Sequence, residues 1–212
     1  MNAVLEKING IHEKGMEKVF KGEVIHFPGF PKTGLLKSHV SLRFGQVSLE
    51  DYRYRLMIPM KSAAQKYGVG LICAEIDYPF HATIGQGTGT VDFDEKDCLV
   101  LSLGIYALPI FFSQVAMDGS NVLLAVSSID PEVISLRKEV AEKHAALGLK
   151  VDTPENILHV SVARIISGTP HAIKEFAQAV CLLREQILRI PLRMVVSGIN
   201  TANEWRFLNS LK

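Results

Sequence analysis

The feature that most constrains this chain is an order of secondary-structure elements that occurs twice. Each time, a predicted strand leads into a predicted helix, a connector, and a second strand that carries a histidine, one further residue and a hydroxyl residue. The two copies share almost no identical residues, so the match is one of pattern. The copies comprise strand 40–44, helix 49–67 and strand His81-x-Thr83, and then strand 122–126, helix 131–147 and strand His159-x-Ser161.

This order predicts an α/β (α+β) protein of two pseudo-repeated lobes, each a sheet with helices on one face. If the lobes face each other, the two histidines meet in the groove between them, where ligand pockets are common. We expect one bilobal domain over residues 38–212, whose lobes can exchange elements. Lobe 1 covers about 38–110 and lobe 2 about 111–212, and residues 1–37 form an N-terminal extension.

Side chains two residues apart on a strand point to the same side, so each strand presents an imidazole beside a hydroxyl. With a pKa near 6.5, one histidine can act as a base while the other, protonated, acts as an acid. Displacement at a phosphate needs both, to activate the attacking oxygen and to protonate the leaving one. The hydroxyls of Thr83 and Ser161 can donate hydrogen bonds to the phosphate oxygens.

The strings Pro79-Phe-His-Ala-Thr-Ile84 and Leu158-His-Val-Ser-Val-Ala-Arg164 resemble the two H-x-[TS]-x motifs of the 2H phosphoesterase superfamily. That superfamily includes the LigT-type RNA 2′,3′-cyclic phosphodiesterases and ligases. The second string resembles it best, because His-Val-Thr-Leu-Ala-Arg is typical of LigT-like members. The resemblance covers about residues 38–212 and implies a bilobal α/β fold and metal-independent attack on a cyclic phosphate.

The resemblance also implies roles for individual residues. His81 and His159 would be the catalytic acid and base, and Thr83 and Ser161 the phosphate-binding residues. Family members often use the arginine after the second motif to hold the substrate, which would be Arg164.

Two substrate contacts carry conditions of their own. Arg164 lies five residues after His159, so it shares the face of the motif only if the strand ends or bulges. Tyr78 is a candidate ring for stacking on a substrate base, and core or rim packing is the alternative.

The pattern predicts a phosphoric diester hydrolase that acts, without cofactor or metal, on a 2′,3′-cyclic phosphate or related phosphodiester of an RNA end or nucleotide. Two rivals stay open: a non-catalytic RNA- or nucleotide-binding module that keeps the groove, and a metal-dependent hydrolase. The run Gly85-Gln86-Gly87, in place of the usual strand continuation, keeps the first rival in view.

Composition narrows the setting. The net charge of +1 and the pI near 7.8 lack the excess of positive charge that is typical of proteins that bind duplex DNA. Three cysteines without a CxxC pair argue against a disulfide framework or structural zinc site. The N-terminus lacks an apolar signal core, and the apolar stretch 98–112 is interrupted and too short to span a bilayer. We expect a reduced, cytoplasmic monomer without a membrane partner.

A third string, His39-Val40-Ser41, fits the same spacing and is an alternative to His81-x-Thr83 as the first motif. It precedes its helix, whereas His81 and His159 follow theirs, so we interpret His39 as a solvent-facing strand residue. The remaining histidines lack a partner pattern and are expected at the surface: His12, His26, His144 and His171.

Capping and turn signals place the other elements. Residues 2–21 are predicted as a helix that Gly10 and Gly15 weaken, and Ser48 and Asp130 are expected N-caps. In the first half of the chain we expect a loop at 26–37, a kink at Pro59, a short apolar run at 71–76 and a strand end at Gly85–Gly89. An element of ambiguous type follows at 93–104, and then a hairpin of 110–115 with 122–126. Near the C-terminus we expect a helix from Thr169-Pro170 to 188 and strands at 192–196 and 205–208.

Overall fold

The structure is a computed structural model that describes residues 2–24, 26–28, 37–88, 105–152 and 157–203. The fold is mixed α/β, which confirms the coarse prediction. Its helices are α1 (Ala3–Lys21), α2 (Gln46–Tyr52), the π-helical turn η1 (Arg53–Met57), α3 (Ile58–Tyr67), α4 (Pro131–Ala146) and α5 (Pro170–Arg189). Its strands are β1 (Lys37–Phe44), β2 (Gly70–Cys73), β3 (Ala82–Thr88), β4 (Pro109–Met117), β5 (Asn121–Val126), β6 (Lys150–Asp152), β7 (His159–Ser167) and β8 (Leu192–Asn203).

The strands form one eight-stranded sheet in the order β2-β7-β5-β4-β8-β1-β3-β6, and every neighbouring pair is antiparallel. The long strand β8 pairs with β4 through its first residues and with β1 through the rest. Each short strand crosses over: β2 follows α3 but pairs with β7, and β6 follows α4 but pairs with β3. We call β3, which His81 directly precedes, and β7, which begins with His159, the histidine-bearing strands. Each is flanked by a strand from the other half of the chain.

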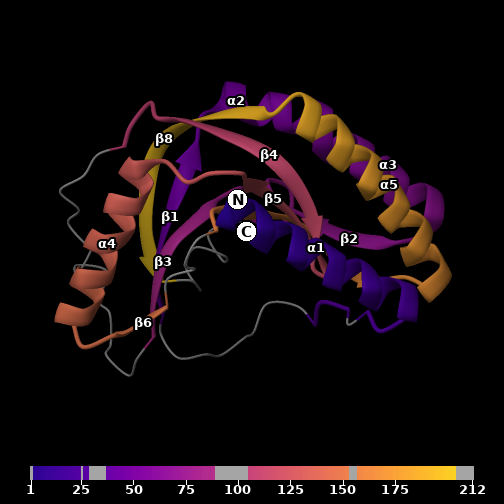
Figure 1. Cartoon of the computed structure of the whole chain (residues 1–212), viewed down its shortest axis with the longest axis horizontal. Helices are drawn as coiled ribbons and strands as arrows, with labels where there is room; N and C mark the ends of the chain where they lie inside the picture. Colours follow the sequence, from indigo (N-terminus) through magenta and orange to yellow (C-terminus); the bar gives the residue numbers. More distant parts are fainter. Residues whose placement is uncertain (1, 25, 29–36, 89–104, 153–156, 204–212) are drawn as a thin grey trace.

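The main core lies between one face of the sheet and the helices α3, α4 and α5. Figure 1 shows α3 and α5 side by side, with α4 at the other end beside β3; α5 packs along β4 and α3 contacts β2. Alternate strand residues fill this core, among them Val40 and Leu42 of β1 and Val160 and Val162 of β7, all at 0 % exposure.

Helix α1 packs on the opposite face of the sheet. Its Ile8 belongs to a separate buried cluster with Ala116, Leu123 and Ala125 of the β4–β5 hairpin, whereas its Val19 joins the main core. A Cβ on Gly15 would lie 2.0 Å from the Met117 carbonyl oxygen, so only glycine permits this approach. The predicted helix is present. Its packing on the sheet offsets the weak helix propensity of glycine.

Several local predictions are confirmed. The hairpin forms, with the Asp118 carboxylate accepting hydrogen bonds from the backbone of Ser120 and Asn121. Asp130 caps α4 and Thr169 caps α5. The interruption expected at Pro59 takes the form of η1, a π-helical turn that ends at Met57, two residues before the proline. The predictions for 93–104 and 205–208, and for most of the loop at 26–37, lie outside the described residues.

Two local predictions, for Ser48 and His144, are wrong, in each case because tertiary contacts decide. Gly45 caps α2, and the hydroxyl of Ser48 instead accepts a hydrogen bond from the backbone N–H of Val195. His144, expected at the surface, is 0 % exposed and packs against Gly87, where an added Cβ would lie 3.2 Å from the His144 ring.

Strand β3, in contrast, runs through Gly85 and Gly87 to Thr88, so it ends within the predicted range 85–89. A Cβ on Gly87 would lie 2.8 Å from the Leu149 side chain. Of the helices that the structure describes, none has the length and apolarity to cross a membrane.

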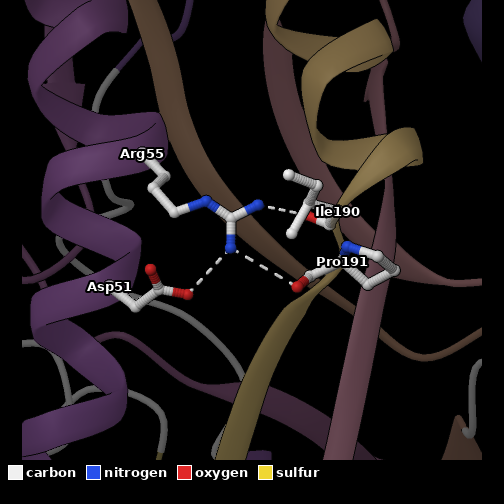
Figure 2. Close-up of polar contacts among 4 residues, drawn as sticks. All are labelled: Asp51, Arg55, Ile190 and Pro191. Atoms are coloured by element: carbon white, nitrogen blue, oxygen red, sulfur yellow. Dashed lines mark hydrogen bonds and ion pairs between the residues drawn. The ribbon is translucent and has the colours of Figure 1, made fainter.

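Arg55 joins the α2–η1–α3 helical run to the end of α5. Its guanidinium donates hydrogen bonds to the carbonyl oxygens of Ile190 and Pro191 and forms an ion pair with Asp51 at 3.0 Å (Figure 2). Carbonyls at a helix C-terminus lack intrahelical partners, so the arginine satisfies groups that would otherwise need water.

We expect Arg55→Met to lower the free energy of unfolding by about 1–2 kcal/mol, because charged hydrogen bonds to backbone carbonyls are lost. The measurement is urea unfolding followed by circular dichroism. Asp51→Asn is the control, since it removes only a partly exposed ion pair and should cost about 0.5 kcal/mol or less. An equal cost for both variants would contradict the role given to the carbonyls.

Candidate active site

The two histidine-bearing strands come together although four strands separate them in the sheet. Residues of β3 and β7 are in contact, so the sheet curls far enough to bring these strands near each other. Both strands direct their apolar residues into the main core, and their half-buried polar residues therefore lie on the other face.

On β7, strand register decides which side chains share that face. His159 lies opposite Ala125 and Ser161 opposite Leu123, and directly opposed residues point to the same side. The register then shifts by one residue, so that Arg164 lies opposite Asn121. This extra residue reverses the alternation. The condition set for Arg164 is therefore met, and it shares the face of His159 and Ser161.

Strand β3 shows the same device, which the sequence did not reveal. Thr83 lies opposite Ser41, the register shifts by one residue, and Gln86 then lies opposite His39. Gln86 therefore shares the face of Thr83, five residues after His81, just as Arg164 lies five residues after His159. The equal spacing was visible in the sequence, but regular alternation places Gln86 on the other face.

His81 lies directly before β3. Its Nδ1 is 2.7 Å from the carbonyl oxygen of Pro79. Because a carbonyl only accepts, Nδ1 carries the hydrogen, and Nε2 is the nitrogen that can take up a proton. Burial lowers the pKa of His81 to about 4, the hydrogen bond to Pro79 opposes this, and Arg164 and His159 lower it further.

His159 is surrounded by charge. Burial has the largest effect and lowers its pKa. The positive charge of Arg137 lowers the pKa further, nearby Asp118 raises it, and Arg164 lowers it by the smallest amount. Arg164 thus acts electrostatically on both catalytic candidates. The two predicted motifs therefore belong to one electrostatic environment.

Arg137 of α4 links the two motif strands. Its side chain is 7 % exposed, and its Nη2 donates to the carbonyl oxygens of Ile157, at 2.5 Å, and Thr83, at 3.5 Å. Within the described part of the chain it forms no ion pair, and burial lowers its pKa to about 10. A buried positive charge therefore lies behind the candidate site.

Tyr78 also connects the motifs. Its hydroxyl donates a hydrogen bond of 2.7 Å to the backbone carbonyl of Ser161, and its ring lies 5.7 Å from the Arg164 guanidinium carbon. The sequence leaves two roles open for Tyr78, stacking on a substrate base and core or rim packing, and its 2 % exposure favours packing. Its buried ring instead helps position Ser161 and Arg164, which also lies 4.5 Å from the ring centre of Phe27.

The interpretation of His39 as solvent-facing is wrong. His39 is 2 % exposed, because β1 is an inner strand and its register turns His39 toward the site-bearing face. Its Nε2 lies 3.0 Å from the hydroxyl oxygen of Thr83, and its ring centre lies 5.3 Å from that of His81 with the planes nearly perpendicular. The structure thus adds a third histidine to the predicted pair.

No family model matches the chain, and a search of curated proteins gives no match either. Among the residues described by the structure, no group of three His, Cys, Asp or Glu side chains is arranged to hold a metal ion.

The buried histidines make a pH prediction for stability. Burial, and then nearby His81, lowers the pKa of His39 to about 3, whereas an unfolded histidine titrates near 6.5. The contribution of neutral His39 to stability is therefore fully present above pH 6.5 and is lost as pH falls toward about 3. At pH 5 the loss is about 2 kcal/mol.

In His39→Gln this group is absent, so the decrease in unfolding free energy between pH 7.5 and pH 5 should be smaller by about 2 kcal/mol. Urea unfolding at the two pH values measures the difference. His171→Gln is the control, because that side chain is exposed on α5 and should leave the decrease unchanged. An identical pH dependence in His39→Gln and the native protein would contradict the prediction.

Proposed function

We propose that this protein is a metal-independent phosphodiesterase of the 2H type, acting on a 2′,3′-cyclic phosphate or related phosphodiester of an RNA end or nucleotide. One observation carries the proposal. The histidine-bearing strands β3 and β7 have the same motif and the same one-residue register shift, and they are in contact.

The strand pairing supports a pseudo-repeat. The pair β1–β3 corresponds to β5–β7, and the short strands β6 and β2 flank the corresponding histidine strands. Strand β8 next to β1 corresponds to β4 next to β5, and these two strands join the halves. In the proposal, the halves are the two lobes and the substrate lies in a groove between β3 and β7.

The polar groups suit a phosphodiester. Thr83 and Ser161 donate hydrogen bonds to non-bridging oxygens, and Arg164 and the buried charge of Arg137 favour an anion. A bound phosphate brings negative charge beside the two imidazoles and raises their pKa values from the low values of the free protein. Substrate binding therefore favours protonation of one of the pair.

In the proposed reaction, the neutral histidine removes a proton from water as the water oxygen attacks phosphorus. The bond between phosphorus and one ribose oxygen breaks, and the protonated histidine gives its proton to that oxygen. The product is a ribose phosphomonoester. Because Nδ1 of His81 donates to Pro79, its Nε2 is the nitrogen that exchanges the proton. The free thiols of Cys73 and Cys181 suit the reducing cytoplasm that we propose as its setting.

The test is hydrolysis of 2′,3′-cyclic AMP by the full chain in the presence of EDTA. We expect a bell-shaped pH profile and a loss of about 10²–10⁴-fold in kcat for His81→Ala and for His159→Ala, because each removes one proton-transfer group. His26→Ala, an exposed position, is the control with native activity.

Other outcomes of the same assay separate the rivals. Undiminished activity in either histidine variant would refute the assignment. Equal binding of 2′,3′-cyclic AMP and 2′-AMP without turnover would indicate the non-catalytic module, and inhibition by EDTA a metal-dependent hydrolase.

Arg164→Met should raise the KM for 2′,3′-cyclic AMP by about tenfold or more, because a charge-assisted contact to the substrate is lost. The matched control is Arg193→Met, an exposed arginine on β8. Equal KM values for both variants would remove Arg164 from the substrate site.

A further inference from the structure

We propose that His39 is a positioning residue of the phosphate site: its Nε2–H donates a hydrogen bond to Thr83, so that the threonine hydroxyl hydrogen points toward the substrate phosphate. This inference rests on the proposed phosphodiesterase function. It adds a residue that neither motif contains.

The contact is specific and enclosed. Nε2 of His39 lies 3.0 Å from Oγ1 of Thr83, between neighbouring strands whose register places Ser41 opposite Thr83 and His39 opposite Gln86. The imidazole is 2 % exposed, so its orientation is set by packing. The ring also lies edge-to-face with His81, at 5.3 Å between centres and 82° between planes. One side chain therefore contacts both members of the first motif.

The direction of the hydrogen bond determines what Thr83 can do. A hydroxyl has one hydrogen to donate and can also accept. If Thr83 donated to His39, its hydrogen would not be available to a phosphate oxygen. If His39 donates through Nε2–H, the hydroxyl accepts from the imidazole and donates to the phosphate, where negative charge develops during reaction.

Burial separates His39 from the proton-transfer pair. It is more enclosed than His81 and His159, which are both half-buried on the same face. Burial and His81 also keep the pKa of His39 at about 3, so it remains neutral where the reaction would run. A neutral imidazole has one N–H, which suits a fixed donor.

Two substitutions separate donation from packing. In His39→Gln the amide nitrogen can replace Nε2–H, whereas His39→Leu keeps bulk but removes the donor. We expect kcat for 2′,3′-cyclic AMP to fall about tenfold in His39→Leu and to stay within about threefold of native in His39→Gln. Equal losses in both would overturn the inference, since a packing role does not distinguish them in this way.

Thr83→Val provides the coupling test. If His39 acts through the Thr83 hydroxyl, His39→Leu should reduce kcat no further in the Thr83→Val background. A further tenfold loss in the double variant would show that His39 acts elsewhere. The bell-shaped pH profile should keep both limbs in His39→Leu, and loss of a limb would make His39 a proton-transfer group instead.

A readout independent of turnover is the ¹⁵N NMR spectrum of the full chain with labelled histidine, in which the His39→Gln variant identifies the His39 signals. We expect the Nε2–H tautomer for His39, with a shift of its Nε2 signal in Thr83→Val. The Nδ1–H tautomer would overturn the inference whether or not the protein hydrolyses the cyclic phosphate. Absence of turnover by the native protein, in contrast, would refute the proposed function.

Discussion

One extra residue in each histidine-bearing strand is the constraint on which the candidate site depends. In a regular strand, residues five apart lie on opposite faces, so Gln86 and Arg164 would point into the main core. The register shifts in β3 and β7 reverse the alternation and place both polar side chains beside the motif residues. In each strand, apolar residues therefore face the helices along its length, and the polar residues of the motif and of the position five residues later share the other face. The same shift in both halves ties the site to the fold.

Burial gives these polar groups their chemical character. Three imidazoles and two guanidinium groups, from His39, His81, His159, Arg137 and Arg164, act on one another in a region that excludes most water. Desolvation and positive charge keep the histidines neutral in the free protein. An anionic ligand would reverse part of that effect, because its charge offsets both desolvation of the protonated ring and repulsion by arginine. In the proposed function, these surroundings favour an anionic substrate in addition to the contacts proposed for Thr83, Ser161 and Arg164.

The sequence predicted features that depend on local order. Strand alternation around Val160, the hairpin at Asp118 and the cap at Asp130 each follow from a few neighbouring residues. It did not predict features that depend on which strands become neighbours. His39 is buried because β1 lies between β8 and β3, and Ser48 bonds to a backbone group far away in the chain. Gln86 joins the site only through cross-strand register. Arg164 is an intermediate case. The sequence showed that it joins the site only if the strand ends or bulges after His159, and the register shift in β7 is such a bulge.

The crossing of β2 and β6 has a consequence for how the chain folds. Each short strand completes the sheet around a histidine strand in the opposite half, so neither half has its full set of neighbours until both are formed. Pairings between β1 and β8, or β2 and β7, join segments that are far apart in sequence, and such topologies have high contact order and fold slowly. Because of the crossing, there is no point along the chain at which the protein could be cut into two halves that each keep all their strand partners. Folding and assembly of the site are therefore expected to be a single cooperative event.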